Sequence, residues 1–144
     1  MKLQFVKSWA GRPEEMPRES KDCTVRATAH ALGICYVKAH ELLKKAGRQD
    51  NTGFEFGAQH EELGFEMRPD LGCMWLERLL PKIPRGRFVV TIRRHAFAIV
   101  HGTVYDHKMP RARASVFMVY EAVGVDENQA LDSGFEEVSK REEK

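Results

Sequence analysis

The first half of the chain carries apolar residues at helical spacing. Val25, Ala29 and Leu32 follow Asp22 at intervals of three or four residues, which predicts a helix that ends at Gly33. A glycine suits that position because it readily adopts the left-handed conformation of a C-terminal cap. Three more helices are predicted, each followed by a glycine or a proline, over residues 37–46, 54–63 and 74–80.

The pattern beyond Gly86 changes to short runs rich in β-branched and aromatic residues. These runs predict strands over residues 88–92, 96–100, 103–105 and 115–123. His101-Gly102 separates the second run from the third and predicts the two-residue turn of a hairpin. Residues 1–9 alternate between apolar and polar and predict one further short strand. The expected fold class is therefore α+β, with N-terminal helices packed on a C-terminal antiparallel sheet.

The domain organisation expected from this pattern is simple. Residues 1–123 form one domain, within which residues 11–21 are a connector rich in glycine, proline and charge. Residues 124–144 form a polar, acidic tail that ends in a frayed helix or a disordered segment. A chain of 144 residues is long enough to bury a sizeable core without disulfides or metals.

The charge balance and the cysteines narrow the class of protein. Lys and Arg number 23 and Asp and Glu number 21, a formal net charge of +2, which argues against a protein that coats nucleic acid or binds membranes through a polybasic segment. No apolar run reaches the roughly 18 residues of a membrane helix, and the first residues do not resemble a secretory signal. The three cysteines contain no C-x-x-C pair. We therefore expect a reduced cytoplasmic protein that needs neither a metal nor a cofactor.

Cys23 is the first residue with candidate chemistry. If Ser20 or Asp22 caps the predicted helix, Cys23 lies in the first turn, where backbone N–H groups and the helix dipole favour a thiolate. The carboxylate of Asp22 acts in the opposite direction, because a neighbouring negative charge raises the pKa of a thiol. The alternative is that Cys23 is a small buried apolar residue.

His95 and Asp106 are the second candidate. With His101-Gly102 as the hairpin turn, residue 100 faces residue 103 and Phe97 faces Asp106. Because alternate residues of a strand share a face, His95, Phe97 and Asp106 point the same way. His95 and Asp106 are then diagonal neighbours, about 7–8 Å apart between backbones and within reach of a side-chain hydrogen bond. An aspartate in that place fixes the tautomer of a histidine and supports its protonated form; the alternative is a plain strand-end histidine.

The remaining histidines are weaker candidates for catalysis or metal binding. His30 shares a helix face with Cys23, but seven residues separate them by about 10 Å, which is too far for direct proton transfer. His40 and His60 are expected on helix faces and His101 in the turn, while strand alternation directs His107 away from His95. No spacing among these residues supports a metal site.

The order of a cysteine on an early helix, a histidine at a strand start and an aspartate on the next strand resembles the papain-like cysteine peptidase superfamily. The match in layout is to the compact form found in bacteriocin-processing peptidase domains and in small phage and bacterial proteins. The matching stretches are residues 22–27 (DCTVRA) and 95–106 (HAFAIVHGTVYD), and the resemblance covers roughly residues 20–122.

The resemblance implies a function and three roles. Cys23 would be the nucleophile, His95 the general base and later acid, and Asp106 the residue that orients His95. The reaction would be acyl transfer through a thioester, hydrolysing a peptide or isopeptide bond of a peptide or protein substrate; deamidation or transamidation would use the same residues.

One element of the family pattern is missing. The superfamily usually has a glutamine a few residues before the cysteine, as an oxyanion donor, whereas residues 16–21 here read MPRESK. The backbone N–H of Cys23, and Ser20, Lys21 or Gln4, are the donors that remain.

The alternative hypothesis is a binding protein without enzymatic activity. Residues 78–113 carry many Lys and Arg residues and a single acid, Asp106. A phage-encoded inhibitor on the same scaffold could bind an acidic partner through a basic face that includes Arg87, Arg93 and Arg94. No aromatic side chains alternate with these cations to form a platform for single-stranded nucleic acid. We therefore expect neither nucleic acid nor a membrane as a partner.

Overall fold

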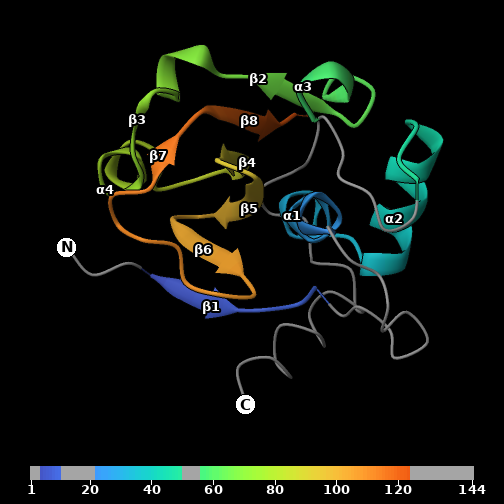
Figure 1. Cartoon of the computed structure of the whole chain (residues 1–144), viewed down its shortest axis with the longest axis horizontal. Helices are drawn as coiled ribbons and strands as arrows, with labels where there is room; N and C mark the ends of the chain where they lie inside the picture. The colour runs from blue at the N-terminus through green and yellow to red at the C-terminus, as the bar shows by residue number, and fades with distance from the viewer. Residues whose placement is uncertain (1–3, 11–21, 50–55, 124–144) are drawn as a thin grey trace.

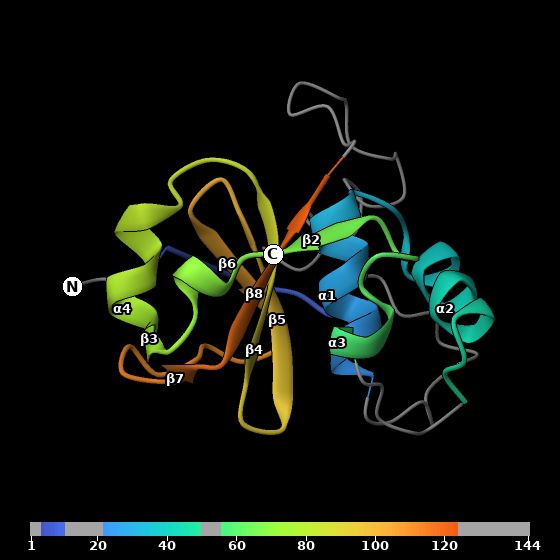
Figure 2. The same ribbon diagram turned by 90° about the horizontal axis from the view of Figure 1, so that it is seen from above.

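The computed structural model describes residues 4–10, 22–49 and 56–123. A central sheet has helices on both faces, and a smaller two-stranded sheet lies beside it. The longest helices, α1 (Cys23–Leu32) and α2 (Tyr36–Lys45), lie on one side together with the short α3 (Phe56–Gln59). The four-residue α4 (Leu76–Leu79) lies on the other side (Figure 2). The α+β class expected from the sequence is confirmed.

The central sheet has six strands in the order β1-β6-β5-β4-β8-β2 (Figure 1). These strands are β1 (Phe5–Lys7), β2 (Phe65–Met67), β4 (Arg87–Ile92), β5 (His95–Val100), β6 (Thr103–Asp106) and β8 (Met118–Ala122). All neighbours are antiparallel except β1 and β6, which are parallel. A separate two-stranded ladder joins β3 (Met74–Trp75) to β7 (Ser115–Val116).

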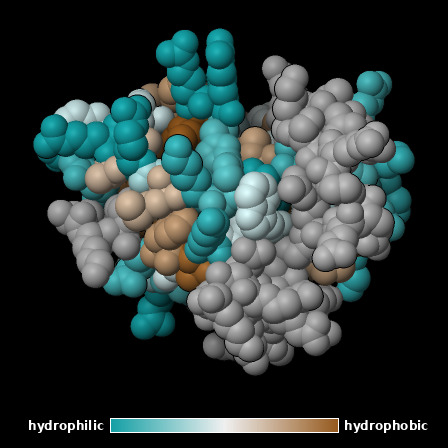
Figure 3. All heavy atoms as spheres, turned by 60° about the horizontal axis from the view of Figure 1, so that its bottom comes forward, coloured by the Kyte–Doolittle hydropathy of each residue, from teal (hydrophilic) through white to brown (hydrophobic). Residues whose placement is uncertain are grey.

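Two apolar clusters fill the two sides of the sheet. Alternate residues of β4 divide between them, with Val89 packed on the α1 side and Val90 on the α4 side. Since both faces are covered, β4 and β5 read as continuous apolar runs rather than alternating ones. The cluster on the α1 side is rich in alanine, which lets the helix approach the sheet closely. On the face shown in Figure 3, hydrophobic atoms reach the surface between protruding hydrophilic side chains.

Helix α1 is buried along almost its whole length. Gly33 ends it in the left-handed conformation (φ 68°), and its N–H bonds the carbonyl of His30, as predicted for a glycine cap. Helix α2 follows within three residues and packs through Tyr36, Ala39, His40 and Leu43. This packing fixes the N-terminus of α1, with Cys23 in its first turn, against the sheet.

The β5–β6 hairpin has the predicted turn and register. His101 (φ 49°) and Gly102 (φ 80°) form its two-residue turn, and Val100 pairs with Thr103. The continuing register places residue 97 opposite residue 106, so the geometry used to bring His95 and Asp106 together is correct.

Other predicted elements differ from the structure. Residues 74–75 are a strand rather than the start of a helix, because the backbone N–H groups on either side, of Cys73 and Leu76, bond Val116 and Ala114. The predicted 115–123 strand divides at Phe117, whose N–H bonds the carbonyl of Thr91. Strand β2 was not predicted, and the predicted 54–63 helix is limited to Phe56–Gln59 among the described residues.

Two predicted segments lie in parts of the chain that the structure does not describe. The acidic tail, residues 124–144, and the connector, residues 11–21, lie outside the described residues. Within the described ranges, no helix has both the length and the apolar character needed to cross a bilayer.

Candidate active site

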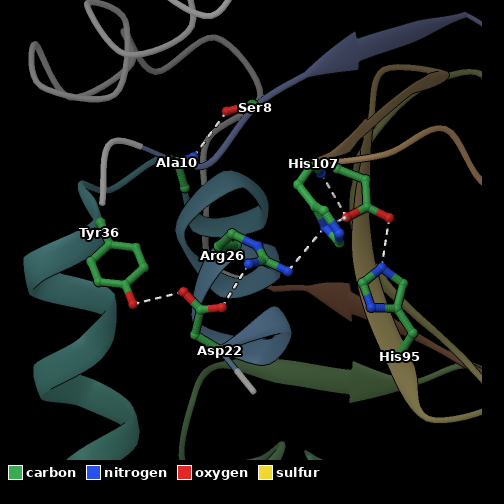
Figure 4. Close-up of polar contacts among 8 residues, drawn as sticks. Ser8, Ala10, Asp22, Arg26, Tyr36, His95 and His107 are labelled. Carbon is green, nitrogen blue, oxygen red and sulfur yellow. Dashed lines mark hydrogen bonds and ion pairs between the residues drawn. The ribbon is translucent and has the colours of Figure 1, made fainter. Parts of the chain in front are cut away.

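Three separate elements bring Cys23, His95 and Asp106 together. Cys23 begins α1, His95 begins β5 and Asp106 ends β6. His95 Nε2 lies 2.6 Å from Asp106 Oδ2, a short charge-assisted contact (Figure 4). His95 also acts on the side chain of Cys23 and lowers the pKa of its thiol. Because Asp106 occupies Nε2, the nitrogen left for the thiol is Nδ1.

The half-buried thiol of Cys23 is poised to ionise. Burial raises the pKa of Cys23, but the hydrogen bond and charge of His95, the backbone N–H of Ala96 and the charge of Arg26 lower it more. The net result is a pKa below that of an ordinary cysteine. A thiolate is therefore more populated at Cys23 than at a free thiol.

His95 is the cationic partner of that thiolate. Burial lowers its pKa, yet the hydrogen bonds and charges of Asp106 and Cys23 outweigh burial and raise the pKa to about 9. Asp106 is only 4% exposed and also accepts a hydrogen bond from the backbone N–H of His107. The edge strand secures the aspartate from its other side, since Lys7 pairs with it and the Ser8 N–H donates to its carbonyl at 2.8 Å.

Asp22 does not act against the thiolate as the sequence suggested. Its carboxylate accepts hydrogen bonds from Arg26 Nη1 at 2.6 Å and from the Tyr36 hydroxyl at 2.9 Å. It also makes no side-chain cap on α1, although it occupies the N-cap position. Its charge is therefore matched inside the protein, and the first N–H groups of α1 are not taken by this side chain.

Arg26 links the helix to the strand that carries the aspartate. Figure 4 shows the contacts running from Tyr36 on α2 through Asp22 and Arg26 to His107. Arg26 Nη2 lies 3.2 Å from His107 Nδ1, and its guanidinium lies 5.1 Å from the centre of the Trp9 ring. Trp9 in turn packs 4.9 Å from the His107 ring.

His107 lies on the same side as His95, contrary to the expectation from strand alternation. The two rings are 5.6 Å apart, because strand β6 ends at Asp106 and the alternation does not extend to residue 107. His107 Nδ1 is also 3.1 Å from Asp106 Oδ1. One nitrogen cannot both accept from Arg26 and donate to Asp106. Since arginine only donates, we assign Nδ1 as the acceptor and the ring as neutral; burial and Arg26 also lower its pKa.

His95, Asp106 and His107 also have the composition of a metal site, with one ligand atom from each lying within 4.8 Å of the others. Two contacts oppose a cation there. The Arg26 guanidinium lies 3.2 Å from His107 Nδ1, and the 2.6 Å contact between His95 and Asp106 leaves no space for an ion between them. This arrangement of donors suits proton transfer better than metal coordination.

The oxyanion donors expected from the sequence are only partly supported. Gln4 lies at the wrong end of β1: its carbonyl bonds the N–H of Val104, about 10 Å along the strand from the Lys7–Asp106 pair. Ser20 and Lys21 lie outside the described residues. The backbone N–H of Cys23, at the positive end of the α1 dipole, remains as a donor.

One of the three arginines predicted to form an exposed basic face is buried. Arg87 is only 6% exposed, and its guanidinium donates to the carbonyl of His30 at 3.2 Å, so its inclusion in an exposed face was wrong. Arg87 is the first residue of β4, directly before a buried apolar run. Arg93 and Arg94 are exposed in the turn between β4 and β5.

Sequence reasoning missed Arg26, Tyr36 and His107. The i, i+4 spacing of Asp22 and Arg26 was a visible signal for an ion pair on the first turn. The contacts of Tyr36 and His107 depend on tertiary packing and had no local signal. Comparison with known proteins found no matching family model, no similar curated protein and no similar solved structure.

Proposed function

We propose that the protein is a cysteine-dependent hydrolase with a papain-like arrangement, which cleaves an amide bond in a peptide or protein substrate. The observation that carries the proposal is the 2.6 Å contact of His95 with the buried carboxylate of Asp106, together with the lowering of the pKa of Cys23 by the same histidine. A nucleophile, its base and a residue that orients the base are the parts that acyl transfer needs.

The reaction proceeds in two steps, formation of a thioester and its hydrolysis. The Cys23 thiolate attacks the carbonyl carbon, forming a C–S bond while the C–N bond breaks, and His95 gives its Nδ1 proton to the leaving amine. Water then attacks the thioester, His95 takes up its proton, and the C–S bond breaks. The Cys23 N–H and the α1 dipole stabilise the negative oxygen in both steps. Asp106 holds His95 and its positive charge throughout.

The two pKa shifts give the pH range in which this pair is active. The pKa of Cys23 is lowered, so thiolate is lost only as the pH falls through that lowered value. The pKa of His95 is raised to about 9, so the proton needed by the leaving group is lost as the pH rises through about 9. The rate should follow a bell-shaped curve with its alkaline limb near that value.

The test compares the three cysteines of one protein. We expect iodoacetamide to modify Cys23 well below pH 8.5, and faster there than either of the other two free cysteines, Cys35 and Cys73. Mass spectrometry assigns the modified residue. Equal pH dependence at Cys23 and Cys35 would contradict an activated nucleophile.

A turnover experiment then identifies the reaction. Wild type is incubated with a complex mixture of peptides, and mass spectrometry reports new termini for hydrolysis or conversion of Gln to Glu for deamidation. Cys23→Ser should abolish either product. Cys35→Ser is the matched control, because Cys35 caps α2 and serine suits that position. A free thiolate also requires a reducing compartment, so we expect the enzyme to act in the cytoplasm.

A further inference from the structure

Three exposed basic residues lie next to the histidine and the aspartate in the chain. Arg93 and Arg94 form the turn between β4 and β5, and Arg94 directly precedes His95. Lys108, also exposed, follows Asp106 by two residues. The backbone of each is therefore within about 8 Å of a residue of the candidate triad.

None of these three cations forms an ion pair with the described part of the chain. Other exposed arginines do: Arg68 contacts Asp70 at 3.0 Å and Glu121 at 2.7 Å, and Arg113 contacts Glu77 at 3.5 Å. The charges around the triad therefore remain available to an external group.

Two acids lie close to the candidate site. Asp22 is matched by Arg26, whereas the Cys23 thiolate and Asp106 share the single positive charge of His95, so the triad carries one net negative charge. Between residues 78 and 120 the sequence contains no acid besides Asp106. Arg93, Arg94 and Lys108 outnumber the one negative charge of the triad, so the charges named here have a positive sum. An approaching acidic substrate is attracted by them within the screening length, which is about 8 Å in physiological salt.

We propose that this site prefers peptide substrates with acidic side chains beside the bond that is attacked, bound by Arg93 and Arg94. The inference rests on the proposed function and adds a substrate class to it. An arginine pair on a rigid two-residue turn suits one or two carboxylates, which guanidinium groups bind in bidentate geometry. A run of phosphates would need a longer basic track, and the net charge is only +2.

The test uses two synthetic peptides with the same N-terminal chloroacetyl group, one with Glu and the other with Gln next to it. The Cys23 sulfur displaces chloride and forms a thioether, whose rate mass spectrometry measures. At low salt we expect Cys23 to react at least about fivefold faster with the Glu peptide. The preference should disappear near 1 M salt, where the screening length is about 3 Å.

Two variants assign the preference to the turn. R93E/R94E should lose or invert it. R93Q/R94N should reduce it towards equality, and Asn suits position 94 because Arg94 has a φ of 57°. K82E/R85E is the control with the same change of charge. Both of its residues are exposed before β4, whose length separates them from the turn by about 17 Å or more.

Several outcomes overturn the inference. A Glu preference that survives R93E/R94E, or that K82E/R85E loses equally, would show that the turn does not select acidic residues. Strong protection of Cys23 by a single-stranded oligonucleotide, without a Glu preference, would assign the cations to nucleic acid. Slow reaction of Cys23 with both peptides at an unchanged ratio would instead contradict the proposed function and leave the charge preference standing.

Discussion

Two histidines lie near opposite ends of helix α1, and their pKa values are shifted in opposite directions. His30, in the last turn of α1, is 1% exposed and packs 4.8 Å from the Tyr105 ring. Burial, then the charge of Arg26, lower its pKa to about 3, against a smaller raising effect of Asp106. His95, at the other end of the helix, has a pKa raised to about 9.

The difference shows what makes a histidine useful for chemistry here. Burial acts on both rings in the same direction, because it disfavours the charged form. Only His95 has a carboxylate within 2.6 Å and a thiol that gains from its charge. A partner of opposite charge, rather than removal from water, therefore separates a reactive histidine from a structural one in this fold.

The largest expected effect comes from removing the reactive histidine. In His95→Ala the thiol keeps its burial, which raises its pKa, and loses its main stabilising contact. We expect alkylation of Cys23 at about pH 6 to fall by about 100-fold or more, while the unfolding free energy changes little. Iodoacetamide rates across pH measure this. Full reactivity of Cys23 in His95→Ala would contradict the assignment of His95 as the reactive histidine.

Asp106→Asn should have the next largest effect. Asparagine can still accept a hydrogen bond, but it lacks the charge that helps to raise the pKa of His95. The alkaline limb of the turnover profile should then move from near pH 9 towards neutral, and the turnover rate should fall by about 10- to 100-fold. NMR titration of the His95 ring reports the same shift directly. An unchanged limb would show that Asp106 only orients the ring.

Arg26→Met should have a smaller effect on Cys23 and a large one on stability. It removes the Arg26 contact from the buried Asp22 carboxylate, which keeps its hydrogen bond from Tyr36, and it removes a positive charge that lowers the pKa of Cys23. Breaking a buried pair costs about 3–5 kcal/mol, which urea unfolding would measure. Arg26→Lys is the control: it should retain most of the thiol pKa and recover only part of the stability, because lysine lacks the planar fork.

His30→Phe should leave Cys23 reactivity near neutral pH unchanged. The substitution should instead change how the free energy of unfolding depends on pH in acid. The unfolded chain binds a proton at His30 below about pH 6.5, whereas the folded protein does so only near 3, so wild-type stability falls over that range by up to about 1.4 kcal/mol per pH unit. The variant should lack this contribution. Urea unfolding at several pH values, compared with wild type, would detect it, and identical slopes would contradict the buried neutral state.

The sequence allowed the core of the candidate site to be predicted where local rules are strict. A two-residue turn fixes register, and strand period then relates His95 to Asp106. The same period failed at His107, because β6 ends one residue earlier. The partners of Asp22 could not be inferred fully, since Tyr36 reaches it only after α2 folds back on α1.

The alanine-rich contact between α1 and the sheet has a consequence for how this protein can change. Ala27, Ala29 and Ala31 on the helix are at most 1% exposed, and Ala96 and Ala98 on β5 belong to the same cluster. A larger side chain at Ala96 or Ala98, on the strand that packs against α1, would move the helix axis outward and carry the sulfur away from the imidazole. The spacing of the reactive pair is thus set by side-chain volume in the interior, and selection on activity and selection on packing act on the same alanines.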